Sequence, residues 1–154
     1  MPASRVRSAA RPPPPDALQT AFRLLGQRAH AEGELRRKLL ARGCPRDEVD
    51  RSVARVRELG YLDDAAFARE LVARRAATRG TRMIAAELAA RGIPREVAQA
   101  AVAAVDHDAA VAAARALAAR SPGVDRRRLA ERLTRRGFAE DVVREALDVA
   151  PDVD

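Results

Sequence analysis

The chain has 154 residues, of which 29 are basic and 22 acidic, and its formal net charge is +7. Alanine occurs 36 times and 28 of the basic residues are arginine, whereas the chain has three Phe, one Tyr and no Trp. A sandwich, a barrel or a doubly wound sheet needs β-branched and aromatic runs that this composition lacks. The expected fold is therefore all-α, in one domain or a few small modules.

The composition also indicates where the protein works. No apolar run reaches the roughly 18 residues of a membrane-spanning helix. Residues 1–15 carry three arginines and four consecutive prolines, without the apolar segment of a secretory signal. A single cysteine cannot form an internal disulfide. We expect a cytoplasmic monomer with no membrane partner, and a disordered Pro/Arg-rich tail over residues 1–15.

From residue 16 onward the apolar spacing is helical, and one pattern occurs three times. Gly43, Gly92 and Gly137 align; each follows an arginine, and apolar residues precede it by four and eight positions. Each glycine suits the left-handed position just past the end of a helix. The repeat unit is predicted to contain three helices, giving an elongated, curved array of about nine. The predicted repeats cover residues 16–60, 61–106 and 107–150.

The first helix of each repeat is predicted to begin at a carboxylate that caps its free N–H groups. The predicted spans are about 16–29, 64–78 and 107–120. The expected capping residues are Asp16, Asp64 and Asp108. Pro45 and Pro94 are expected in the first turn of the helix after the glycine, where a missing N–H does no harm.

Candidate catalytic groups have simpler structural explanations. Cys44 follows Gly43 as Ile93 and Phe138 follow their glycines, which indicates a core thiol rather than a nucleophile or metal ligand. The two histidines are isolated, so no zinc site is predicted. Adjacent carboxylates at 63 and 64 are typical of a helix cap. With no phosphate-binding glycine loop or nucleophile elbow, we expect a protein that is not an enzyme and holds no cofactor or metal.

Arginine is the remaining feature, and it gathers in two clusters. The middle cluster consists of Arg74, Arg75, Arg79 and Arg82, and the only acids near it in the sequence are Glu70 and Glu87. The second cluster spans 126–136 and includes Arg127, Arg128, Arg135 and Arg136, with Asp125 and Glu131 among its neighbours. Each cluster has two explanations: a surface that faces a polyanion, or a solvated face with ion pairs such as Arg127 with Glu131.

Two segments resemble the bacterial regulatory protein RecX family. Residues 60–68 (GYLDDAAFA) resemble its signature, and residues 80–93 (GTRMIAAELAARGI) resemble the helix and turn that follow. Residues 29–35 (AHAEGEL) match in part, because Ala31 stands where the family usually has Ser or Thr at a helix cap. The resemblance is specific over about 17–106 and looser to 150. Within the signature, we expect Tyr61, Leu62 and Phe67 to pack, and Asp63 or Asp64 to cap.

The resemblance implies a non-enzymatic modulator of the RecA recombinase, built from three three-helix repeats. Such proteins bind the RecA–DNA filament and restrain its ATPase, strand-exchange and coprotease activities, which places the protein in DNA repair and the SOS response. The expected partners are the RecA filament and single- or double-stranded DNA without sequence preference. Three glutamines and no asparagine argue against base reading. The alternatives are a general nucleic-acid-binding helical protein and a helical scaffold for another partner.

Overall fold

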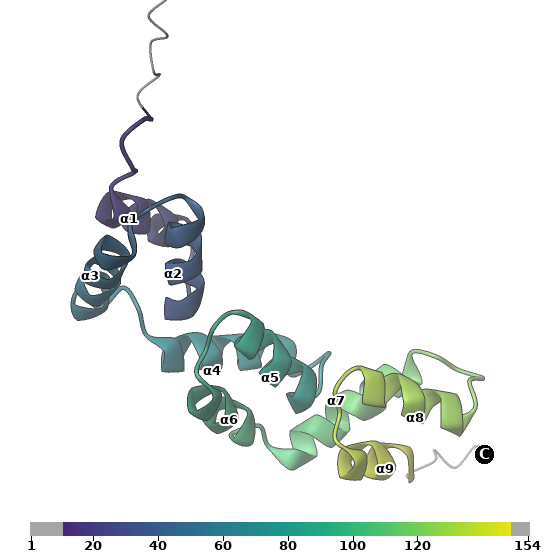
Figure 1. Ribbon diagram of the computed structural model, residues 1–154. Helices are drawn as coiled ribbons and strands as arrows, with labels where there is room; N and C mark the ends of the chain where they lie inside the picture. Colours follow the sequence, from purple (N-terminus) through teal and green to yellow (C-terminus); the bar gives the residue numbers. More distant parts are fainter. Residues whose placement is uncertain (1–10, 149–154) are drawn as a thin grey trace, which may run out of the picture.

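The structure, a computed structural model, describes residues 11–148, and within them it contains nine α-helices and no strand (Figure 1). The all-helical prediction is confirmed. The helices of the first group are α1 (Ala17–Gln27), α2 (Glu32–Ala41) and α3 (Arg46–Glu58). Those of the second are α4 (Asp64–Arg75), α5 (Thr81–Ala90) and α6 (Arg95–Ala103). Those of the third are α7 (His107–Ala119), α8 (Arg126–Arg135) and α9 (Glu140–Asp148).

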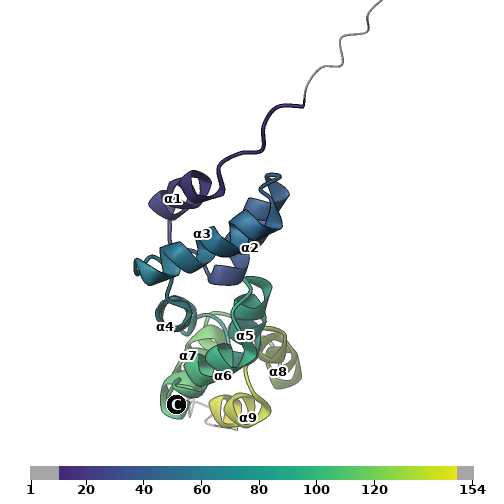
Figure 2. The same cartoon turned by 60° about the vertical axis from the view of Figure 1, so that its left-hand side comes forward.

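Each group of three helices has a hydrophobic core of its own. Helices α1, α2 and α3 pack mainly against one another, and the same holds for the second and third groups. The cores are centred on Leu39 and Val53, on Ile84 and Leu88, and on Leu133 and Phe138. The groups follow one another in a bent row rather than gathering round one centre (Figures 1 and 2). The expected elongated and curved array of three repeats is therefore confirmed.

The turn between the second and third helix of each group has the predicted geometry. Gly43, Gly92 and Gly137 have φ values of +85°, +81° and +89°, which a residue with a Cβ adopts only with strain. The next residue is buried in all three groups, with at most 4% of its surface exposed. These residues are Cys44, Ile93 and Phe138. The repeat pattern therefore identified both the turn and the side chain that anchors it.

Of the carboxylates expected to cap the first helices, Asp108 is wrong by two positions, and of Asp63 or Asp64 it is Asp63 that caps α4. Asp16 accepts from the backbone N–H of Gln19 as expected, but Asp63 caps α4 and Asp106 caps α7. Asp64 and Asp108 instead lie in the first turns of those helices. The prolines 45 and 94 occupy the cap position itself, one residue before the first turn. Helix α1 also ends at 27 and α4 at 75, earlier than the spacing predicted.

The aromatic residues of the 60–68 segment do not all pack. Leu62 and Phe67 are buried as expected, but Tyr61 is 56% exposed. Its ring forms a T-shaped pair with the ring of Phe22, with ring centroids 5.5 Å apart and planes at 81°. Tyr61 therefore contributes a surface contact between the segment that follows α3 and α1, rather than a core side chain.

Adjacent repeats meet where the second helix of one begins and the second helix of the next ends. At the first junction a Cβ on Gly33 would lie 2.8 Å from the carbonyl oxygen of Gly92. At the second, the backbone N–H of Gly80 donates to the carbonyl of Arg136 over 2.9 Å, and that of Arg82 to Gly137 over 3.1 Å. Helices α2, α5 and α8 thus run head to tail along the row, joined by close backbone contacts, and Ala31 at the start of α2 is buried in the core of the second group.

Among residues 11–148, no helix is long and apolar enough to cross a membrane. The tail predicted for 1–15 falls largely outside the described residues. Residues 11–15 are exposed and have no regular secondary structure. The last two residues of the third predicted repeat, 149 and 150, also lie outside.

Candidate functional surface

Two arginines of the middle cluster are bound to a glutamate. Arg75 makes a two-pronged pair with Glu87, with both N···O distances 3.1 Å, and Arg79 reaches the same carboxylate at 2.7 Å. Arg91 adds a third contact at 3.3 Å. The hydrogen bond from Arg75, with the neighbouring arginine charges, lowers the pKa of Glu87. Of the two explanations given for this cluster, the ion-paired face therefore holds for Arg75 and Arg79.

The other two members of the middle cluster are exposed. Arg74 lies in the last turn of α4 and Arg82 in the first turn of α5. Neither has an ion-pair partner in the part of the chain that the structure describes. Three guanidinium groups also share the single charge of Glu87, so the cluster retains positive charge despite the pairing.

The second cluster is divided along α8. Arg127 pairs with Glu131 at 3.3 Å and Arg128 with Asp125 at 3.4 Å, both at the start of the helix. Arg135 and Arg136 stand at its other end, eight residues further on and so about 12 Å away along the helix axis. The predicted pair between Arg127 and Glu131 is confirmed. These four residues form one cluster in the sequence, and the structure separates them into two pairs.

The end of α8 meets the middle cluster at the junction of the second and third repeats. Arg136 donates to the carbonyl of Thr78 over 3.2 Å, in the turn between α4 and α5. Arg82 lies at the same junction, because its backbone N–H binds Gly137. We refer to Arg74, Arg82, Arg135 and Arg136 as the junction arginines. Two clusters far apart in the sequence therefore meet at one junction, through Arg82 and Arg136.

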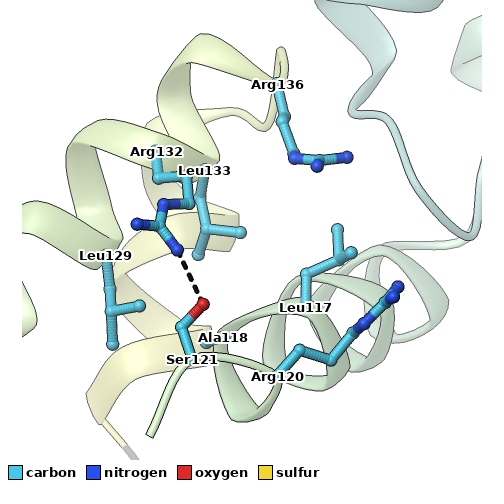
Figure 3. A pocket seen from close by; sticks show the side chains of 8 residues that line it. All are labelled: Leu117, Ala118, Arg120, Ser121, Leu129, Arg132, Leu133 and Arg136. Atoms are coloured by element: carbon cyan, nitrogen blue, oxygen red, sulfur yellow. Dashed lines mark hydrogen bonds between the residues drawn. The ribbon is translucent and has the colours of Figure 1, made fainter. Parts of the chain in front are cut away.

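Beside this junction, the third repeat contains a cavity of about 250 Å³ between α7 and α8. Figure 3 shows Arg120, Arg132 and Arg136 around the side chains of Leu117 and Leu133. Arg132 donates to the hydroxyl oxygen of Ser121 over 2.6 Å. Neither Arg120 nor Ser121 was predicted as a site residue from the sequence. The signal that could have found Arg120 is its place at the end of the first helix of its repeat, where Arg28 and Arg75 also stand.

The first repeat holds a charged network that is partly buried. The carboxylate of Glu34 is bound by Arg28 and by Lys38, whose Nζ lies 3.3 Å away. These partners outweigh the effect of burial and lower the pKa of Glu34 to about 2. His30 is 3% exposed; its Nδ1 lies 2.9 Å from the carbonyl of Arg28 and its Nε2 3.0 Å from Lys38 Nζ. Burial, with the nearby cations, lowers the pKa of His30 and keeps the ring neutral.

Asp64 provides the cap that Ala31 cannot. Its carboxylate accepts from the backbone N–H of Glu32 over 2.9 Å, at the start of α2. Burial raises the pKa of Asp64 although this hydrogen bond opposes the shift. A residue of the second repeat therefore caps the N-terminus of a helix of the first repeat.

The remaining candidate groups lie apart. Cys44 is buried, and this burial raises the pKa of its thiol, as expected of a packed side chain. His107 begins α7 and pairs with Glu145 at 2.8 Å. The described residues contain no group of three His, Cys, Asp or Glu side chains that could hold a metal ion.

The fold and the surface define a helical-repeat protein of three three-helix groups, each with a hydrophobic core of its own. Two family models match the chain: the first three-helix domain of RecX at residues 17–55 and the second at 63–102. The regulatory protein RecX of Stenotrophomonas maltophilia strain R551-3 is 38% identical over 149 residues, covering 92% of this chain and 91% of the relative. That of strain K279a is 36% identical over the same coverage. The chain belongs to the RecX family of regulatory proteins.

Solved structures have the same fold. The crystal structure of RecX from Lactobacillus salivarius matches with a TM-score of 0.79 at 19% identity, covering 87% of this chain and 96% of that one. A second crystal structure of a regulatory protein RecX matches with a TM-score of 0.77 at 22% identity, over 86% of this chain and 71% of that one. At these identities the likeness supports the all-helical repeat architecture.

Proposed function

We propose that this protein binds the RecA–DNA filament and restrains its ATPase, strand-exchange and coprotease activities, without chemistry of its own. Membership of the RecX family carries this proposal. In this proposal, the protein acts in the cytoplasm as a monomer during DNA repair and the SOS response.

The junction arginines are the proposed contact surface. They come from two repeats, so a bent row of repeats can present them together to one partner. Their positive charge attracts the phosphates of DNA or acidic filament surfaces from a distance. Arginine also binds phosphate and carboxylate groups through two parallel hydrogen bonds, which fixes orientation as well as charge.

The test is RecA ATPase on single-stranded DNA, titrated with this protein. Arg74→Ala/Arg82→Ala removes two exposed cations of the junction and breaks no ion pair among the described residues. Removing two charge-assisted hydrogen bonds to the filament should raise the half-inhibitory concentration about tenfold or more. Arg127→Ala/Arg128→Ala is the matched control, because it removes the same charge at the far end of α8. Equal effects of the two variants would place the contact surface elsewhere.

A second candidate function is general nucleic-acid binding, which the net charge of +7 favours. DNA binding measured without RecA separates it from the first. If the parent protein binds DNA strongly but leaves RecA ATPase unchanged, this second function replaces the first. If it does neither, the helical scaffold for another partner remains.

A further inference from the structure

The first two repeats each hold a carboxylate between the end of the first helix and the body of the second. In the first repeat it is Glu34, bound by Arg28 from the end of α1 and by Lys38. In the second it is Glu87, bound by Arg75 from the end of α4 and by two further arginines. The side chains of Glu34 and Glu87 are only 13% and 15% exposed. In each of these two repeats, an internal carboxylate therefore offsets part of the charge of the basic side chains around it.

The third repeat keeps the cations and lacks the carboxylate. Arg120 stands at the end of α7, as Arg75 does at the end of α4. Five residues before the turn glycine, where the second repeat has Glu87, the third has Arg132. Among the described residues, no acidic side chain lines the cavity between these helices. The glutamate of α8, Glu131, is 57% exposed and pairs with Arg127 outside the cavity.

We propose that this cavity binds a phosphate group, whose negative charge has the part in the third repeat that Glu87 has in the second. The group belongs either to the backbone of a nucleic acid or to free phosphate. The backbone assignment rests on the proposed function, since DNA is part of the filament. Phosphate binding itself requires neither RecA nor inhibition.

The lining of the cavity suits an anion. Arg120, Arg132 and Arg136 supply planar groups with several N–H donors each, whose geometry matches phosphate oxygens. Because Arg132 donates to the oxygen of Ser121, the hydroxyl hydrogen of Ser121 remains available to a ligand. Leu117 and Leu133 exclude water from one side, which strengthens the attraction between opposite charges.

One effect opposes binding and is outweighed. The cavity lies near the C-terminal ends of α7 and α8, where helix dipoles disfavour an anion. Glu87 lies near the corresponding ends of α4 and α5, and its pKa is nevertheless below the ordinary value because of its arginines. Three guanidinium groups therefore suffice to hold a negative charge at this place.

The decisive variant is Arg132→Glu, which gives the third repeat the carboxylate that the second repeat has five residues before its turn glycine. It should keep the helical content and the melting temperature of the parent, because Arg132 is exposed and forms no ion pair among the described residues. The methyl NMR signals of Leu117 and Leu133 report on the cavity. The probes are inorganic phosphate and a short single strand of deoxythymidine, each added to the full chain without RecA. Parent signals should shift, and in the variant affinity should fall about tenfold or more.

The control is Arg127→Glu, which reverses the same charge on the same helix outside the cavity. Its affinity should fall far less, whereas Arg132→Glu should also lower the salt slope of strand binding by about 0.7 for each phosphate that is no longer bound. Should Arg132→Glu fail to fold, Arg120→Gln serves instead, since Arg120 has no ion pair among the described residues.

The outcomes separate the possibilities. Shifts with the strand assign the site to the nucleic-acid backbone, and shifts with inorganic phosphate alone assign it to free phosphate. Unshifted signals with both probes, or equal reductions of affinity in the two charge-reversal variants, overturn the proposal. Because no RecA is present, a positive result here stands even if the protein fails to inhibit the filament.

Discussion

The junction between the second and third repeats makes one glycine intolerant of the smallest side chain. A Cβ on Gly80 would lie 2.1 Å from the backbone nitrogen of Phe138 and 2.2 Å from the carbonyl carbon and oxygen of Gly137. The obstacle is backbone, which cannot rotate away. Gly26 in α1 is the matched control, because a Cβ there meets nothing within 4 Å. The same change, glycine to alanine, should therefore have opposite effects at the two positions.

The expected magnitudes follow from these contacts. Gly80→Ala forces the repeats apart, which breaks the hydrogen bonds from Gly80 to Arg136 and from Arg82 to Gly137. Each contributes about 0.5–1.5 kcal/mol, and overpacking adds about 1–3 kcal/mol. The resulting destabilisation of about 2–6 kcal/mol corresponds to a fall of about 4–24 °C in melting temperature at this size. Gly26→Ala should instead stabilise the protein by about 0.5–1 kcal/mol through helix propensity.

Circular dichroism at increasing temperature measures both effects. Because each repeat has its own core, Gly80→Ala should keep most of its helical signal at room temperature, while small-angle X-ray scattering shows a changed shape. If Gly80→Ala melts at or above the temperature of Gly26→Ala, the close backbone contact at this junction is wrong.

Three further predictions concern single residues. Asp64→Ala should cost about 0.5–2 kcal/mol of unfolding free energy because α2 loses its cap, a change that chemical denaturation measures and that Asp64→Asn should partly restore. Cys44→Ala should cost about 1–2 kcal/mol through a small cavity, and native Cys44 should react slowly with a thiol reagent; rapid labelling contradicts its burial. The lowered pKa of His30 means that the neutral ring stabilises the fold above about pH 6.5 and that this stability is lost as the pH falls. His30→Gln should therefore shrink the drop in melting temperature between about pH 7.5 and 5.5, and an unchanged drop refutes the assignment.

Features with local causes could be predicted from the sequence. The turn glycines, the buried residue after each and the three-helix unit all depend on residues within one or two helical turns. The burial of Cys44 was predictable because the equivalent residues of the other two repeats are Ile93 and Phe138. Both are apolar, which identifies a position that packs in the core. The pair of Arg127 with Glu131 needed only the spacing of one helix.

Contacts between elements could not be predicted in this way. Asp64 caps a helix that begins 32 residues earlier in the chain, and Arg136 binds a carbonyl 58 residues away. The choice between Asp63 and Asp64 as the cap of α4 depends on which carboxylate the neighbouring repeat uses. The packing of Tyr61 depends on α1, because the aromatic ring it meets is that of Phe22.

The arginines show that the number of acids nearby in the sequence does not determine which arginines form ion pairs. The middle cluster has few acids in its sequence neighbourhood, yet the fold brings Arg75, Arg79 and Arg91 to one glutamate. The third repeat has more acids nearby, yet Asp125 and Glu131 lie outside the cavity and pair with exposed arginines. Between these two repeats, the decisive quantity is the charge of the residue five positions before the turn glycine. Where that residue is Glu87 the arginines stabilise the fold, and where it is Arg132 the same arrangement leaves their hydrogen-bonding groups for an external anion.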